Sequence, residues 1–200
     1  MVRTGRPRAF DLDQALEAAL LVFWEHGYEA TSLAQLREAL GVSSASFYAA
    51  FSSKEDLFVR VVERYMSGYG TVASHLADED RTPREAIERF LRASVAMQTD
   101  AAHPLGCLLI MTGTLTGPAN ARVRALLAGY RDVQRRNLLA RIERAVADGE
   151  LPADTDATAL ETLFHMFVAG ISTEARDGVP ASTIDGALDH LMRLWDSLAR

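Results

Sequence analysis

TSLAQLREALGVSSASFYAAFSSKEDLF, residues 31–58, is the stretch that decides the fold of this chain. Two short helical patterns are joined by a turn at Gly41-Val42, and an aromatic-rich stretch leads into a further helix start at Ser53-Lys54. The second short helix begins with small polar residues. A short helix, a glycine turn and a second helix of this kind are typical of helix-turn-helix proteins, whose second helix enters the major groove of DNA. The stretch therefore predicts a function as well as a fold.

The composition is that of an ordinary globular protein. The chain has 200 residues, of which 48% are hydrophobic and 24% charged, and one cysteine. No apolar run approaches the roughly 18 residues of a membrane span, and the basic N-terminus lacks the apolar segment of a signal peptide. We therefore expect a cytoplasmic protein with no membrane partner. The net charge of −6 argues against indiscriminate nucleic-acid binding, although a local basic patch can still support specific binding.

The hydrophobic pattern is helical throughout and predicts an all-α fold of about nine helices. Ser32 with Gln35 forms a capping-box start, and Ser43 and Ser53 are N-caps for the next two helices. We expect the first helix to end at Gly27, the second at Gly41, and the fourth to loosen near Gly68 and Gly70. The first helix is expected over 11–26, and those after the fourth are expected over 83–100, 106–115, 119–147, 155–175 and 182–199.

The helix-turn-helix stretch contains the residue types that DNA binding requires. Small residues at the start of the second helix can approach base edges. Polar or charged residues at helix starts can hold phosphates. The candidates are Ser43, Ser44, Ala45 and Ser46 for bases, and Thr31, Tyr48 and Lys54 for phosphates. Taken singly, each serine could be only a cap, Tyr48 only a core residue and Lys54 only a solvated charge; the combination is far more specific.

Residues 10–58 resemble the N-terminal domain of the TetR/AcrR family of one-component transcriptional regulators. The resemblance rests on the first helix ending FWEHGY at 23–28, on Thr31-Ser32 and Gly41-Val42-Ser43, and on Tyr48, Phe51, Lys54-Glu55 and Leu57. It implies that Thr31, Tyr48 and Lys54 contact phosphates and that residues 43–46 face bases. Many relatives carry a long polar side chain at the position of Ser44 and glycine or proline at that of Ala45, so the operator sequence is not predicted.

The pattern divides the chain near residue 70, where the fourth helix loosens at Gly68 and Gly70. We expect a flexible basic arm over 1–9, a helix-turn-helix DNA-binding domain over 10–70, and a ligand-binding and dimerisation domain over 71–200. In the arm, Arg6 and Arg8 flank Pro7, which suits an A·T-rich minor groove. The alternative is a disordered basic tail that adds only nonspecific attraction.

Two apolar stripes near the C-terminus follow helical spacing and resemble coiled-coil seams. In the family such helices pair with their symmetry mates in a four-helix dimer interface, and packing within one subunit is the alternative. The candidate interface residues are Leu160, Leu163, Phe167, Ile171, Leu188, Leu191 and Trp195.

The resemblance places a ligand pocket among the fifth to eighth helices. Methionine and aromatic side chains suit an adaptable apolar cavity, so we expect a small apolar or aromatic effector, although any single residue could be plain core. The candidate lining residues are Met97, Cys107, Leu108, Met111, Tyr130, Phe164 and Met166.

Cys107 also permits a redox or metal sensor. His103 lies four residues before it, but Pro104 and Gly106 interrupt the helix and no further ligand is evident. We expect a buried, inert thiol, no metal site and no cofactor.

Together these features predict a sequence-specific transcriptional regulator and not an enzyme. No phosphate-binding glycine loop, no carboxylate pair at catalytic spacing and no activated nucleophile is recognisable. We expect a homodimeric repressor that an effector releases from a palindromic double-stranded operator. A helix-turn-helix adaptor that binds a protein partner, and a metal or redox sensor through Cys107, are the alternatives.

Overall fold

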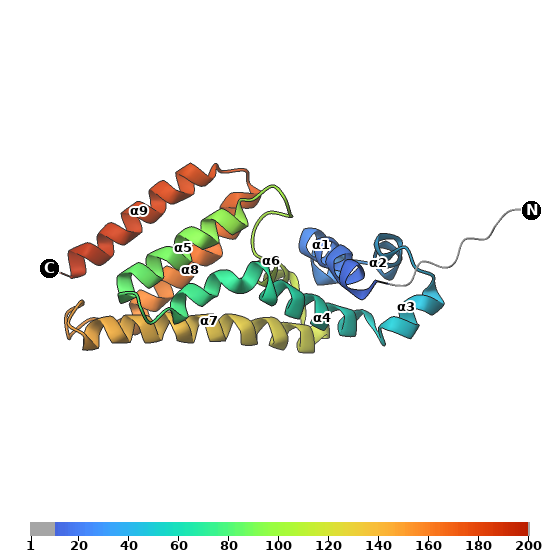
Figure 1. Ribbon diagram of the computed structural model, residues 1–200, viewed down its shortest axis with the longest axis horizontal. Helices are drawn as coiled ribbons and strands as arrows, with labels where there is room; N and C mark the ends of the chain where they lie inside the picture. The colour runs from blue at the N-terminus through green and yellow to red at the C-terminus, as the bar shows by residue number, and fades with distance from the viewer. Residues whose placement is uncertain (1–10, 200) are drawn as a thin grey trace, which may run out of the picture.

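The computed structural model describes residues 11–199, and this part of the chain contains helices and no strand. Figure 1 shows an elongated molecule with α1 to α3 gathered near one end and α9 at the other. We call Leu12–Ser67 the head and Pro83–Leu198 the body. The helices are α1 (Leu12–Ala30), α2 (Leu33–Leu40), α3 (Ser44–Ala50), α4 (Lys54–Ser67), α5 (Pro83–Gln98), α6 (Leu108–Leu115), α7 (Ala121–Ala147), α8 (Ala157–Arg176) and α9 (Ala181–Leu198), with 3₁₀ segments η1 (Tyr69–Ala77) and η2 (Pro118–Asn120).

The helix starts of the head follow the predicted caps. Ser32 and Gln35 form the capping box, with the Gln35 N–H donating to Ser32 Oγ at 3.2 Å and the Ser32 N–H donating to Gln35 Oε1 at 2.8 Å. Ser43 and Ser53 accept from the backbone N–H groups of Ser46 and Asp56. These bonds satisfy amide groups that have no partner inside the helix. The predicted helix starts are therefore confirmed.

Two glycines end or interrupt helices where the sequence predicts it. Gly41 has a φ of 65° and closes α2 in the left-handed conformation. Gly27 has a φ of 77° and interrupts α1, after which the helix resumes to Ala30. The predicted end at Gly27 thus falls at the break, and the additional turn beyond it was not predicted.

The segment after α4 differs from the expectation of a simple loosening. The chain continues as the 3₁₀ segment Tyr69–Ala77. Gly70 lies directly against α4, because a side chain there would come within 2.9 Å of Met66 Sδ. A larger residue at this position would have to displace the flexible end of the Met66 side chain.

The hydrophobic core forms two clusters. The first contains the buried aromatic residues of the head and also Leu108, Leu109, Val123 and Leu127 from α6 and α7. The second lies within the body and includes η1. Because α6 and the start of α7 pack into the core of the head, the two parts of the molecule share buried surface.

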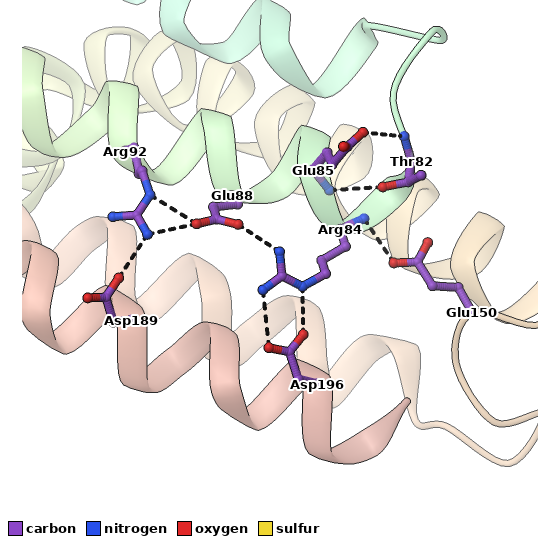
Figure 2. A network of polar contacts seen from close by, with 8 residues as sticks. All are labelled: Thr82, Arg84, Glu85, Glu88, Arg92, Glu150, Asp189 and Asp196. Carbon is purple, nitrogen blue, oxygen red and sulfur yellow. Dashed lines mark hydrogen bonds and ion pairs between the residues drawn. The ribbon is translucent and has the colours of Figure 1, made fainter. Parts of the chain in front are cut away.

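An ion-pair network holds α9 against α5, as Figure 2 shows. Arg84 donates to Asp196 through Nε at 2.6 Å and through Nη2 at 3.2 Å. Glu88 joins Arg84 to Arg92, and Arg92 reaches Asp189 at 2.8 Å. Each exposed pair contributes little alone, and the buried apolar residues of α9 pack into the same core cluster as those of α5.

Among the described helices, none combines the length and the apolar composition that crossing a bilayer requires.

Candidate nucleic-acid interface and ligand cavity

The helix α3, which we call the reading helix, presents the predicted base-contacting residues to solvent. Ser43, Ser44, Ala45 and Ser46 are all exposed. Ser43 Oγ lies 3.0 Å from Ser46 Oγ and also accepts from the Ser46 backbone N–H at 3.1 Å. Phe47 on the opposite face is fully buried and anchors the helix in the core of the head. The first turn is therefore exposed on a rigidly held helix, the arrangement that base-edge contact requires.

Two of the predicted phosphate-binding residues flank this surface. Tyr48 is 54% exposed, so it is not a core residue. The Lys54 ammonium lies 4.4 Å from the centre of the Tyr28 ring, in cation–π geometry. Partial burial lowers the pKa of Lys54, and the neighbouring Glu29 carboxylate opposes this shift. Tyr48 is thus open to solvent, while Lys54 packs against the Tyr28 ring at the start of α4.

Thr31 corrects the expectation for the third phosphate contact. Its exposed fraction is 1%, and its hydroxyl donates to the Gly27 carbonyl at 2.7 Å. The interruption of α1 at Gly27 leaves this carbonyl in need of a donor, and Thr31 supplies it. Thr31 is therefore a structural residue in this conformation. Arg6 and Arg8 lie outside the described residues.

The head is hydrogen-bonded to the start of α6. Trp24 Nε1 donates to the Gly106 carbonyl at 3.0 Å. Arg176, in the last turn of α8, donates to the carbonyls of Leu105 at 3.0 Å and Trp24 at 2.8 Å. A residue near the end of α8 thus joins the loop before α6 to α1.

The head is also bonded to the loop after α6. The Glu29 carboxylate accepts from the Gly117 N–H at 2.6 Å and from Asn120 Nδ2 at 2.9 Å. These two hydrogen bonds, that of Asn120 first, lower the pKa of Glu29. The loops on both sides of α6 are therefore hydrogen-bonded to α1.

A small cavity of about 40 Å³ lies inside the molecule near α6. Its walls come from α4, η1, α5, α6, α7 and α8, together with Cys107 just before α6. Of the residues predicted to line a ligand pocket, Met97, Cys107 and Tyr130 do so.

The other four predicted lining residues lie elsewhere. Leu108 and Phe164 are fully buried in the two cores. Met111 packs beside Gly106. Met166 is 59% exposed on the outer face of α8. Sequence spacing places a residue on a helix face but does not say which face turns toward an internal cavity, and this accounts for the four corrections.

The cavity also contains functional candidates that the sequence did not single out. Tyr65 and Met66 come from α4, and Arg131 and Gln134 come from α7. Nothing in the local sequence distinguishes Arg131 from the other arginines of α7. The one signal was Gly113 in the middle of α6, an unfavourable helix residue whose missing side chain leaves room for the Arg131 guanidinium.

Cys107 lines the cavity and has two polar neighbours, of which Tyr65 also lines it. The Tyr65 hydroxyl donates to Cys107 Sγ at 3.3 Å, and the Cys107 N–H donates to Ser172 Oγ at 3.2 Å. Burial raises the pKa of the Cys107 thiol, with the Tyr65 hydrogen bond opposing it. His103 turns to a different neighbour, because its ring stacks on Trp24 with 4.4 Å between ring centres.

The two C-terminal stripes separate into inner and outer faces. Leu160, Ile171, Leu188 and Trp195 are buried in the core of their own subunit, which corrects the expectation that they meet a partner. Leu163, Phe167 and Leu191 are only partly buried. Three further apolar residues of α8 and α9, which are not among the candidate interface residues, are exposed, namely Met166, Leu194 and Leu198. The apolar surface open to a partner is therefore displaced around each helix from the predicted stripe.

Comparisons with known proteins agree with this arrangement. The family model described as "Bacterial regulatory proteins, tetR family" matches residues 15–61. The model described as "Tetracyclin repressor-like, C-terminal domain" matches residues 83–191.

Two curated relatives come from Escherichia coli strain K12. The HTH-type transcriptional repressor ComR is 34% identical over 199 residues, which cover 98% of this chain and 94% of ComR. The HTH-type transcriptional repressor BdcR is 37% identical over 109 residues, which cover 53% of this chain and 54% of BdcR.

A solved structure of a cysteine mutant of the TetR family regulator CifR, complexed with 26-bp double-strand operator DNA, is also similar. It is 38% identical, with a TM-score of 0.87, and the match covers 95% of this chain and 100% of the CifR chain. Sequence, fold and relatives are thus those of regulators and not of enzymes. The chain belongs to the TetR family of DNA-binding transcriptional regulators.

Proposed function

We propose that the chain is a homodimeric repressor, released from a palindromic operator by a small effector that binds in the cavity between α4 and α8. One observation carries this proposal. Tyr65 and Met66 of the cavity wall belong to α4, the same helix that begins with Lys54 beside the reading helix. A ligand in the cavity therefore touches α4, which is itself a helix of the head.

The cavity contacts a second element bonded to the head. Leu109 and Ile110 of α6 line the cavity, and both ends of α6 are hydrogen-bonded to α1. An effector changes operator affinity only if it binds one arrangement of the heads better than the other. Ligand contact with α4 and α6 supplies such a difference, because movement of either helix displaces the head.

Dimerisation is supported by the outward apolar residues of α8 and α9. Met166, Leu194 and Leu198 are exposed, and Leu163, Phe167 and Leu191 lie partly open beside them. An apolar surface of this kind on a folded chain favours association. A two-fold dimer would present two reading helices to half-sites about 34–36 Å apart, hence the palindromic operator.

The repressor role is supported by the relatives. ComR and BdcR are named as repressors, and the CifR mutant is complexed with operator DNA. The exposed first turn of the reading helix supports the same mode of binding here.

Sedimentation of the protein with and without a palindromic duplex selected from random DNA tests the proposal. We expect a dimer alone and one dimer per duplex. Met166→Asp should give monomers that bind the duplex weakly. Leu115→Asp is the matched control, since Leu115 is also an exposed apolar residue but lies at the end of α6. Stoichiometric binding of one protomer per palindrome, or a Met166→Asp variant that remains dimeric with full affinity, would contradict the proposal.

A further inference from the structure

One cationic side chain lies on the wall of the otherwise largely apolar and aromatic cavity. Arg131 extends from α7 to α6, where its Nη1 donates to the Leu109 carbonyl at 2.8 Å. Gly113 makes this position available, because a side chain at residue 113 would collide with the guanidinium. A glycine inside a helix costs stability relative to alanine, by about 1 kcal/mol. Two features, the glycine and the long reach of the arginine, therefore combine to place a positive charge at the cavity.

Arg131 lacks the carboxylate partner that three other arginines of α7 have. Arg122, Arg135 and Arg144 pair with Glu55, Glu161 and Asp148. Within residues 11–199, no ion pair joins Arg131 to a carboxylate, and the adjacent Asp132 acts on it only at longer range. Arg124, Arg136 and Arg141 also have no ion pair with a carboxylate within the described residues. Arg124 and Arg136 are exposed, Arg141 lies about three turns beyond Arg131 along α7, and none of the three lines this cavity.

The partial burial of Arg131 makes the absence of a carboxylate partner energetically unfavourable. Arg131 is partly buried, and this burial lowers the pKa of its guanidinium. A charge removed from water is unfavourable unless an opposite charge and hydrogen bonds compensate it. A guanidinium carries five N–H donors in a planar fork that matches a carboxylate. Only one of its donors is bonded to the protein within the described residues, so several remain for a ligand.

The rest of the wall suits a short apolar body. Met97, Tyr130 and Val168 line the cavity, and Gln134, one turn beyond Arg131, adds a polar amide. A volume of about 40 Å³ holds roughly three water-sized groups. The flexible thioethers of Met66 and Met97 can move to admit a somewhat larger molecule.

We propose that this cavity binds a small organic carboxylate, with the carboxylate paired to Arg131 and a short apolar body against Met97 and Tyr130. The inference rests on the proposed function, because it names the chemical class of the effector of that same cavity. It also changes the sequence-based expectation, since the ligand is an acid with an apolar part and not a purely apolar or aromatic molecule.

Matched acids and amides test the proposal directly. Propionate, butyrate and benzoate are compared with propionamide, butyramide and benzamide, which keep the shape and lack the charge. Binding to the full-length protein is measured by calorimetry, and operator affinity by anisotropy of a labelled duplex. We expect at least one acid to bind tenfold or more tightly than its amide, as a charge-assisted pair implies, and to weaken operator binding.

Variants locate the charge that is responsible. Arg131→Gln should reduce acid affinity tenfold or more, and Arg131→Lys should retain part of it. Arg136→Gln is the matched control, because Arg136 is exposed on the same helix and its loss changes the net charge equally. Gly113→Ala keeps the charge but displaces the guanidinium, so it should also weaken acid binding. This second variant tests the site if Arg131→Gln does not fold.

Several results would overturn the inference. These are equal binding of an acid and its amide, wild-type acid affinity in both Arg131→Gln and Gly113→Ala, an equal loss in Arg136→Gln, or no binding of any acid. The proposed function fails separately. If a neutral amide releases the operator, the result supports the proposed repressor and contradicts a carboxylate site at Arg131. If an acid binds through Arg131 without changing operator affinity, the result supports the carboxylate site and contradicts release of the operator by an effector in this cavity.

Discussion

The reading surface and the cavity are built in opposite ways. Residues 43–54, which carry the candidate DNA contacts, are nearly continuous in sequence and largely exposed. The cavity draws its wall from residues between Tyr65 and Val168 on six helical elements and the loop before α6. The residues of one exposed turn are neighbours in the sequence, so a short motif is enough to identify them. The residues of a cavity come together only when helices distant in sequence pack against one another. The head can therefore be recognised from a short motif, and the effector site cannot.

The same contrast predicts how substitutions act. Side chains of the reading surface meet solvent, so changing them should alter DNA affinity and leave stability nearly unchanged. Side chains beneath that surface belong to the shared core, so changing them should unfold the head. Changes at the cavity or at the bonds around α6 should act on communication between the two regions.

The largest effect is expected from Phe47→Ala. Phe47 is fully buried beneath the reading helix, and removing such a ring costs about 3–5 kcal/mol of unfolding free energy. Hydrogen exchange of the head should rise much more than that of α8 and α9, and urea denaturation should show the loss. Tyr48→Ala, at the adjacent exposed position, is the control and should change stability little. Equal destabilisation by the two substitutions would remove the distinction between surface and core.

The next largest effect concerns operator affinity. Tyr48→Ala and Lys54→Ala should each weaken binding by roughly tenfold or more, because each removes a candidate phosphate contact. Lys54→Ala should also reduce the salt dependence of binding by about one unit of slope. Anisotropy titrations over a range of salt concentrations measure both quantities. An unchanged slope in Lys54→Ala would mean that this lysine does not hold a phosphate.

An intermediate effect is expected in the reactivity of Cys107. Burial raises the pKa of this thiol, so at neutral pH it stays protonated and should react with iodoacetamide roughly an order of magnitude more slowly than a free thiol. The positive charge of Arg131 lowers the pKa of Cys107, so Arg131→Gln should slow the reaction further. Rates followed by mass spectrometry from pH 7 to pH 10 test this. Fast alkylation at pH 7 would instead favour the redox alternative.

The smallest effect is expected at Glu29. Its hydrogen bonds to Asn120 and Gly117 lower its pKa in the folded state. The resulting stabilisation of the loop after α6 is present above the ordinary glutamate pKa of 4.5 and is lost as the pH falls through the lower folded value. Hydrogen exchange at residues 117–120 should rise in that range.

Glu29→Gln should abolish this pH dependence and should remove the stabilisation of the loop already at neutral pH, giving only a few-fold rise in exchange there. Glu38→Gln, an exposed glutamate at the end of α2, is the control. Identical pH profiles for the two variants and the wild type would show that Glu29 does not hold the loop.

Local signals predicted much of the fold. The caps at Ser32, Ser43 and Ser53 and the turn at Gly41 are satisfied by hydrogen bonds within a few residues, so sequence spacing alone identifies them. The bounds of the body helices agree with prediction to about two residues, because their starts and stops are also local. The 3₁₀ segment Tyr69–Ala77 was not predicted, since it depends on packing against α4 and α5.

The site was predicted less completely, and the reasons are physical. Thr31 has the residue type of a phosphate ligand, but a carbonyl exposed by the Gly27 break takes its hydroxyl. Trp195 lies on a helical stripe, and only the packing of α9 on α5 shows that this stripe faces inward. Arg131 is one arginine among many until the fold brings it beside Gly113. Each case requires knowledge of a partner distant in sequence or of a local break in the helix.

Selection from a random duplex library measures the central claim most directly, namely that a dimer binds DNA through the reading helix. The wild type, Tyr48→Ala and Lys54→Ala are compared at several salt concentrations, with Glu38→Gln as the control. We predict enrichment of a palindrome whose half-site centres lie about 10 bp apart, with weaker enrichment for both variants and normal enrichment for the control. No enriched sequence, or equal enrichment by all four proteins, would contradict the account and would point to a helix-turn-helix adaptor that binds a protein.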